Sequence, residues 1–168
     1  IPIELRVLPI RLREDPSKIF GIYYRHPIDL AFEAKDEVSR AHFRRRAERE
    51  HADMVAHGTR NVVLSLYTPP ADASGKFDFR WEPLAEKLAL WEKHRFVGPI
   101  VMGINTAGVY EKHLRERYGS HLRGVKAPPA AFSEEITRMV RAIEAERVAR
   151  GWPEFLYYPI DEPGHGAA

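Results

Sequence analysis

Residues 56–64 (AHGTRNVVL), 93–102 (KHRFVGPIVM) and 149–158 (ARGWPEFLYY) share one pattern, and this pattern decides the fold class. Each segment begins with basic or histidine residues typical of a helix end and leads within a few residues into a short apolar run. Short apolar runs separated by helical patterns are typical of parallel strands that are covered on both faces. The sequence therefore predicts an α/β protein built from repeated helix–loop–strand units.

This pattern places the expected elements along the chain. Four strands are expected, at residues 19–24, 61–67, 99–104 and 155–160. Three helices are expected between them, at about 36–57, at about 81–94 and from Ser133, a good N-cap, onward. The segments that leave the first three strands are expected to be long loops of the kind that build sites in α/β proteins, at 25–35, 68–80 and 106–132.

The first 14 residues follow a different pattern. In residues 1–13 (IPIELRVLPIRLR), Ile3, Leu5 and Val7 alternate with charged residues, which predicts a strand with one buried face. We interpret residues 1–14 as the last strand of an antiparallel β domain and residues 15–168 as a second, truncated domain. The chain begins with isoleucine and not methionine, which fits this interpretation as a fragment.

The missing nucleotide motifs favour a barrel over an open sheet. Neither Gly-x-Gly-x-x-Gly nor Gly-x-x-x-x-Gly-Lys-Ser/Thr occurs in the sequence. A complete (β/α)8 barrel takes about 250 residues. We therefore expect a partial (β/α)8 barrel that holds about the first four strands and three helices. Because half a barrel leaves strand edges and an apolar inner face open, we also expect the truncated chain to self-associate.

Composition excludes several classes of function. The 168 residues carry 26 Lys+Arg and 24 Asp+Glu, and the balance of 26 − 24 = +2 argues against a nucleic-acid-binding protein. The absence of cysteine excludes disulfides, thiolate metal sites and thiol nucleophiles. No apolar run is long enough to span a membrane. His51 and His57 lie six residues apart, not the four that a zinc-binding helix needs, and we predict neither metal nor cofactor.

The candidate catalytic residues are Asp161 and Glu162, which follow the fourth strand in residues 157–164 (YYPIDEPG). Two acids at the mouth of an apolar strand are costly unless they are used or paired. Adjacent carboxylates couple, so that one stays ionised while the pKa of the other rises, which keeps a general acid protonated near neutral pH. The alternative is that both residues cap the next helix or face water in a loop.

Five further residues follow the expected strands at the same edge, and we predict that they contact substrate: Tyr24, Arg25, His26, Tyr67 and Asn105. Aromatic faces stack on sugar rings, whereas Arg and Asn form directed hydrogen bonds to hydroxyl groups. Tyr23 and Tyr24 should point to opposite faces of the sheet, so at least one of them is expected to pack in the structure. A cationic group beside a sheet interior normally needs an acidic partner, for which Asp161 is the candidate; the alternative is that Arg25 is an ordinary surface arginine.

The sequence also resembles a known enzyme family. Residues 3–12 (IELRVLPIRL), 20–25 (FGIYYR), 51–64 (HADMVAHGTRNVVL) and 157–163 (YYPIDEP) are similar to segments of glycoside hydrolase family 123. The resemblance covers nearly the whole chain, and its one sharp motif is Asp-Glu-Pro. It implies the end of a β-sandwich followed by a (β/α)8 barrel, the activity of a β-N-acetylgalactosaminidase, a carbohydrate substrate and a secreted or periplasmic parent protein.

The resemblance also implies roles for the acid pair. Glu162 would be the general acid/base, and Asp161 would orient the 2-acetamido group of the substrate, whose oxygen attacks the anomeric carbon. Two other readings stay open. In one, another kind of barrel glycosidase uses Glu162 as acid/base and takes a nucleophilic carboxylate from the missing half. In the other, the domain only binds glycans or has a structural role.

Overall fold

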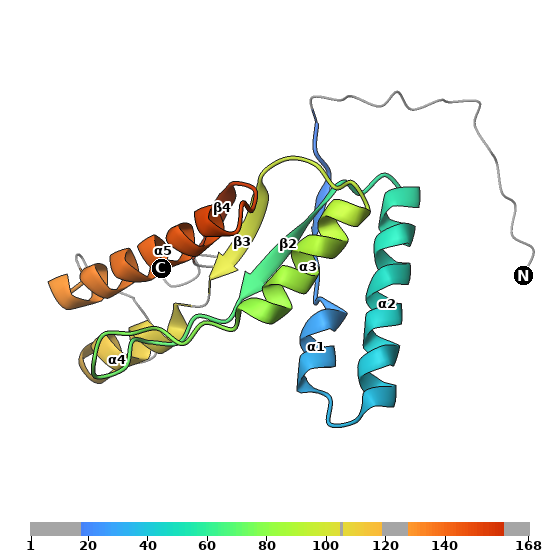
Figure 1. Ribbon diagram of the computed structural model, residues 1–168. Coiled ribbons are helices and arrows are strands. Elements are labelled where there is room, and N and C mark those ends of the chain that lie inside the picture. Colours follow the sequence, from blue (N-terminus) through green and yellow to red (C-terminus); the bar gives the residue numbers. More distant parts are fainter. Residues whose placement is uncertain (1–17, 105, 119–127, 160–168) are drawn as a thin grey trace, which may run out of the picture.

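One parallel sheet organises the part of the chain that the computed structural model describes, which is residues 18–104, 106–118 and 128–159. Its strands are β1 (Gly21–Tyr23), β2 (Asn61–Leu66), β3 (Ile100–Ile104) and β4 (Phe155–Tyr158). Their order in the sheet, β1-β2-β3-β4, is their order along the chain (Figure 1). The predicted α/β class with four parallel strands is confirmed. The strand expected within residues 1–14 lies outside the described residues.

Five helices lie in the described ranges, so the prediction of three was wrong. They are α1 (Pro27–Glu33), α2 (Glu37–Ala56), α3 (Trp81–Lys93), α4 (Ala107–Tyr118) and α5 (Ala130–Ala149). The additional two, α1 and α4, occupy segments that the sequence predicted as loops. Helix α1 has only 7 residues. The two buried residues of α4, Val109 and Leu114, lie five positions apart, so its apolar pattern is weak.

The helix starts depend on capping, and the one predicted cap, Ser133, was wrong. Asp36 caps α2 by accepting a hydrogen bond from the Ser39 backbone N–H at 2.8 Å. Helix α5 begins at Ala130, and Pro129 occupies its N-cap position without a side-chain bond. Ser133 therefore lies inside α5 and not at its cap. As a result, Glu135 lies in the second turn of the helix, where it is buried.

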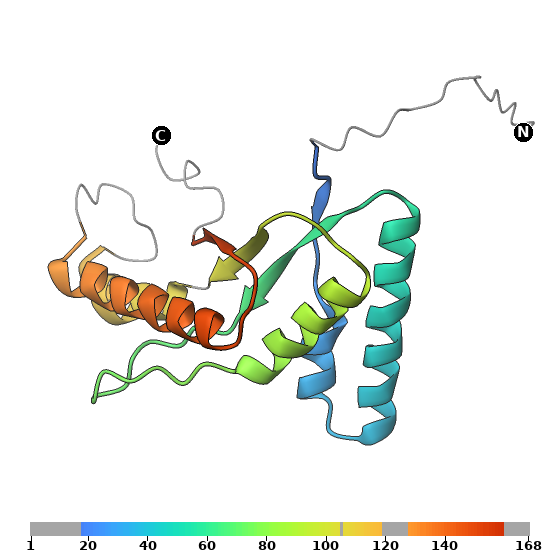
Figure 2. The same ribbon diagram turned by 45° about the horizontal axis from the view of Figure 1, so that its top comes forward.

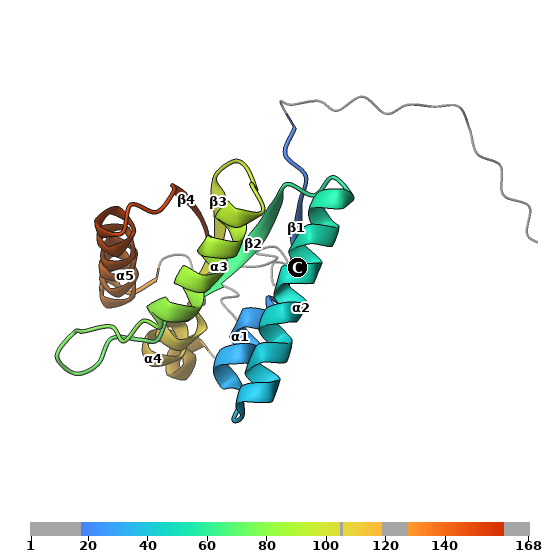
Figure 3. The ribbon, with the colours of Figure 1, turned by 45° about the vertical axis from the view of Figure 1, so that its right-hand side comes forward.

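One face of the sheet packs against the helix layer. Alternate residues of the strands point to this face, and β2 contributes Val62, Leu64 and Leu66, all buried. The same core contains Leu84 and Leu88 of α3 and a buried pair from α5, Met139 and Ile143. Helices α2, α3 and α5 therefore cover one face (Figures 1 and 3). The shorter helices flank this layer, α1 against α2 and α4 against α5 (Figure 2).

The opposite face of the sheet is concave. The rings of Tyr23 in β1 and Tyr158 in β4 meet edge to face, with their centroids 6.1 Å apart. These strands are separated by β2 and β3, and in a flat sheet three strand spacings would place them roughly 14 Å apart. The contact between the two tyrosines therefore indicates a sheet curved toward this face, which is compatible with part of a barrel.

Candidate functional site

The carboxyl ends of the strands form the edge at which sites of parallel α/β proteins lie. Two of the predicted substrate-contacting residues are accessible there. Arg25 follows β1 and is exposed, with no ion pair to another described residue. Tyr67 follows β2, and its side chain is 53% exposed. The structure thus leaves both side chains free to contact a ligand, and their predicted role stays a prediction.

Tyr24 and His26 instead point into the helix layer. The Tyr24 hydroxyl donates to Glu50 Oε2 at 2.6 Å, and burial together with this carboxylate raises the pKa of Tyr24. His26 is buried and caps α1, its Nδ1 accepting from the Ile28 N–H at 3.2 Å. Both side chains are occupied by structural bonds, and their predicted contact with substrate stays a prediction. As predicted, Tyr23 and Tyr24 point to opposite faces.

The remaining predicted site residues, Asn105, Asp161 and Glu162, lie outside the described residues. The structure does describe the chain leading to the acid pair. Strand β4 ends at Tyr158, so Pro159 follows the strand and removes no ladder bond. The Pro159 carbonyl accepts a hydrogen bond from Thr106 Oγ1 at 3.2 Å. This bond joins the segments that follow β3 and β4 directly before the acid pair.

A cleft of about 250 Å³ opens where β2 ends, between α1 and α3. Lys87 of α3 lies at its base and is only 1% exposed. The Lys87 ammonium bonds to Asp29 Oδ1 at 2.5 Å and to the Ser65 carbonyl at 2.9 Å. Burial lowers the pKa of Lys87, and the Asp29 carboxylate opposes this shift. Tyr67 and Arg80 form another wall of the cleft, and the guanidinium lies 4.7 Å from the ring centroid.

A second charged cluster fastens the loop between β2 and α3. Glu135 of α5 is 1% exposed and accepts bonds from the Ala71 N–H at 2.7 Å, Lys112 Nζ at 2.9 Å and His113 Nε2 at 2.6 Å. Lys112 also donates to the Ala71 carbonyl at 3.0 Å. Burial alone would raise the pKa of Glu135, but the donors His113, Lys112 and Ala71 outweigh burial and lower it to about 2. The cluster ties the loop to α4 and α5.

Sequence reasoning missed both Lys87 and Glu135, although each had a signal. Lys87 lies three residues after Leu84 and four before Trp91, inside the apolar stripe of α3. Glu135 precedes Met139 and Ile143 at intervals of four, on the buried stripe of α5. A charged residue in an apolar stripe is rarely buried without a partner. The partners themselves come from distant segments, which the stripe does not identify.

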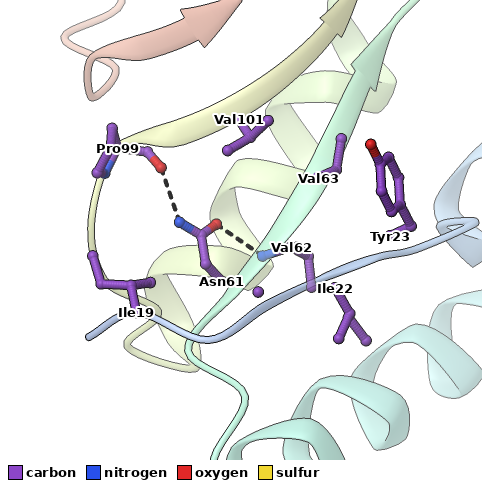
Figure 4. A pocket seen from close by; sticks show the side chains of 9 residues that line it. Ile19, Ile22, Tyr23, Asn61, Val62, Val63, Pro99 and Val101 are labelled. Atoms are coloured by element: carbon purple, nitrogen blue, oxygen red, sulfur yellow. Dashed lines mark hydrogen bonds between the residues drawn. The ribbon is translucent and has the colours of Figure 1, made fainter. Parts of the chain in front are cut away.

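Another cleft, of about 330 Å³, lies at the opposite edge of the sheet, where the strands begin (Figure 4). Its lining is mainly apolar and includes Ile19, Ile22 and Val101. Asn61 is its main polar side chain, and its amide donates to the carbonyls of Val97 at 3.1 Å and Pro99 at 2.9 Å. The Asn61 oxygen accepts from the Val62 N–H at 2.8 Å. The Asn61 amide therefore uses its hydrogen bonds to hold the starts of β2 and β3 together.

No group of three or more His, Cys, Asp or Glu side chains in the described ranges is placed to hold a metal ion. Within the same ranges, no helix is long and apolar enough to cross a membrane.

Comparison with known proteins adds no family or fold assignment: no family model, no curated protein and no solved structure matches this chain.

Proposed function

We propose that this chain is the first half of a (β/α)8 barrel from a glycoside hydrolase that acts on β-linked N-acetylhexosaminides. The observation that carries the proposal is the sheet order β1-β2-β3-β4, all parallel, with Asp161-Glu162 separated from the end of β4 by two residues in the sequence. Strands of a barrel follow chain order without reversal, whereas a doubly wound sheet reverses at a switch point. The curvature that brings Tyr23 to Tyr158 supports the same reading.

In the proposed reaction the substrate supplies its own nucleophile. The 2-acetamido oxygen attacks the anomeric carbon and forms a C–O bond as the glycosidic C–O bond breaks. Glu162 donates its proton to the departing oxygen, and Asp161 holds the acetamido N–H and stabilises the positive charge that develops there. Water then opens the cyclic intermediate, with Glu162 as the base, and two inversions give net retention. No metal or cofactor takes part.

Groups at the carboxyl edge supply binding partners for this reaction. Arg25 and Tyr67 are exposed there, after β1 and β2, at the same edge as the end of β4. The glycine at position 103, near the end of β3, adds no side chain to the concave face. An accessible cation and an aromatic ring suit the hydroxyl groups and the apolar face of a pyranose.

Glu162→Gln tests the proposal in the complete gene product. With a β-N-acetylgalactosaminyl disaccharide, kcat should fall about 10²- to 10⁴-fold, because the leaving sugar needs a proton. An aryl glycoside with a good leaving group needs less protonation and should lose less. Asp161→Asn should impair both substrates, because both use the acetamido group. Glu154→Gln, an exposed carboxylate at the start of β4, is the matched control and should not change kcat.

The outcomes of this test separate the open readings. Unchanged turnover in both Asp161→Asn and Glu162→Gln would contradict the proposal. Inhibition by a thiazoline that mimics the cyclic intermediate supports substrate assistance, and a trapped glycosyl-enzyme would indicate a protein nucleophile instead. Glycan binding without turnover would indicate a binding domain.

We also expect the four-stranded unit on its own to self-associate. Strand β1 and the described residues before it, 18–20, expose large apolar side chains, among them Phe20 at 67% and Tyr23 at 71%. An exposed strand with apolar side chains is a template for pairing with another chain. Light scattering on the 168-residue chain measures this directly, and a clean monomer at micromolar concentration would contradict the expectation.

A further inference from the structure

The cleft between α1 and α3 holds polar groups that the fold does not use. Lys87, at its base, is engaged by Asp29 and Ser65. Around it, no hydrogen bond or ion pair joins Glu33 or Arg80 to another described side chain, apart from the contact of Arg80 with the Tyr67 ring. Asp29 uses one carboxylate oxygen for Lys87, and its side chain is 40% exposed. Acceptors on α1 therefore face a donor and an aromatic ring across the cleft.

The charges in this cleft cancel. Asp29 and Glu33 contribute two negative charges, and Lys87 and Arg80 contribute two positive charges. A phosphate or carboxylate ligand would meet two carboxylates, and a cationic ligand would meet an ammonium and a guanidinium. A neutral ligand with several hydroxyl groups avoids repulsion from either set of charges. A hydroxyl group can donate a hydrogen bond to a carboxylate and accept one from Arg80 or Tyr67.

The walls of the cleft are held in place before a ligand binds. Lys87 connects α1 to β2 and α3, because its bonds reach Asp29 and Ser65 from a position in α3. Arg80 lies over the Tyr67 ring and fixes two long side chains against each other. A site whose side chains are already ordered loses less conformational entropy when it binds.

We propose that this cleft is a subsite for a neutral pyranose unit, bound next to the N-acetylhexosaminyl unit that the enzyme hydrolyses. The inference rests on the proposed function. The cleft opens at the end of β2, two strands away from the end of β4, and two strand spacings amount to roughly 10 Å. A di- or trisaccharide reaches across that distance. The subsite would make the enzyme prefer a longer oligosaccharide to a monosaccharide glycoside.

Binding measurements on the complete gene product test the subsite without turnover. The probes are a neutral β-N-acetylgalactosaminyl trisaccharide and the aryl monosaccharide glycoside, each measured by calorimetry with the Glu162→Gln enzyme. Glu33→Gln and Arg80→Ala should each weaken trisaccharide binding about tenfold, the effect of one lost hydrogen bond to a charged group. Neither change should alter binding of the aryl glycoside. Glu92→Gln and Arg141→Ala are matched exposed controls on α3 and α5.

Tyr67→Phe and Tyr67→Ala distinguish the ring from the hydroxyl group. Because Tyr67 is 53% exposed, both variants should keep the melting temperature of the parent. Equal trisaccharide affinity in the parent, Glu33→Gln, Arg80→Ala and Tyr67→Ala proteins would overturn the subsite. Saturable binding of a zwitterionic amino acid in the cleft, displaced by none of the sugars, would also overturn it.

The two proposals fail in different ways. If Glu162→Gln abolishes hydrolysis while the cleft variants bind trisaccharide normally, the subsite is wrong and the proposed function stands. If the cleft variants lose sugar binding in a protein that hydrolyses no glycoside, the cleft binds a sugar, whereas the proposed function, and with it the role of the cleft as a subsite of a hydrolase, is wrong.

Discussion

The two edges of the sheet each carry a cleft, and they differ in how their polar groups are used. At the amino edge, the cleft of about 330 Å³ is the larger, but the amide of Asn61 is fully bonded to backbone groups. At the carboxyl edge, the cleft of about 250 Å³ contains charged groups such as Glu33 and Arg80, which have no such partners in the described part of the chain. The two clefts therefore differ in unused hydrogen-bonding capacity, and this difference does not follow their size.

Removing the buried carboxylate Glu135 should have the largest effect on stability. In Glu135→Ala the His113 donor loses its acceptor, Lys112 keeps only the Ala71 carbonyl, and the Ala71 N–H loses its partner. Breaking a buried ion pair from one side costs about 3–5 kcal/mol. Urea unfolding of the complete protein measures this loss. The neighbouring Glu134 is exposed, so Glu134→Ala is the control and should change stability by less than about 0.5 kcal/mol. Equal stability of the two variants would contradict the role of the cluster.

The amino edge should respond next, in stability alone. Asn61→Ala removes three hydrogen bonds to the strand starts and should cost about 2–3 kcal/mol. Asn61→Asp keeps the acceptor for the Val62 N–H but loses the two donated bonds. Its loss of unfolding free energy should therefore come from the carbonyls of Val97 and Pro99, which lose their donor. Calorimetric affinity for the trisaccharide should stay unchanged in both variants. If an Asn61 variant stays folded but binds the trisaccharide more weakly, the amino edge also contributes to sugar binding, which would contradict the distinction between the two edges.

Acid should destabilise the carboxyl edge through His26. Burial, followed by the nearby charges of His51 and Lys87, lowers the pKa of His26 from 6.5 to about 2. Below pH 6.5, His26 therefore binds a proton in the unfolded chain but stays neutral in the folded chain. The free energy of unfolding falls as the pH drops toward 2. The slope approaches about 1.4 kcal/mol per pH unit, or about 2 kcal/mol by pH 5.

A cap-preserving variant tests the assignment to His26. His26→Asn keeps a good N-cap for α1 but cannot titrate, so its stability should vary less between pH 7 and pH 5. The exposed His57→Asn is the control and should keep the pH dependence of the parent. An unchanged slope in His26→Asn, measured by urea unfolding at both pH values, would rule out His26 as the source.

Much of the sheet could be predicted from the sequence because its signal is local. The apolar runs at β2 and β3 are bounded by turns, and the structure places strands there within one residue of the expected ends. Helices α1 and α4 were missed for the opposite reason. Helix α1 begins with Pro27 and depends on the side chain of His26 as its cap, and the few buried residues of α4 lack helical spacing.

The candidate site was predictable only in part. Arg25 and Tyr67 lie at the expected edge because strand ends in a parallel sheet point the same way. Tyr24 and His26 instead bond to Glu50 of α2 and to the first turn of α1. A nearby helix can satisfy a polar side chain at a strand end, and no local pattern records which helix that will be.

By itself, the sequence determined the α/β class, the parallel strands and the position of an acid pair after the fourth strand, since apolar periodicity and turn residues act over a few positions. Only the tertiary structure decided which charged side chains bond to other parts of the described chain and which stay accessible to a ligand. Lys87 forms an ion pair with Asp29, 58 residues away in the sequence, and Glu135 accepts a hydrogen bond from Ala71, 64 residues away. Such pairs form because burying an unpaired charge costs more than ordering the segments that pair it.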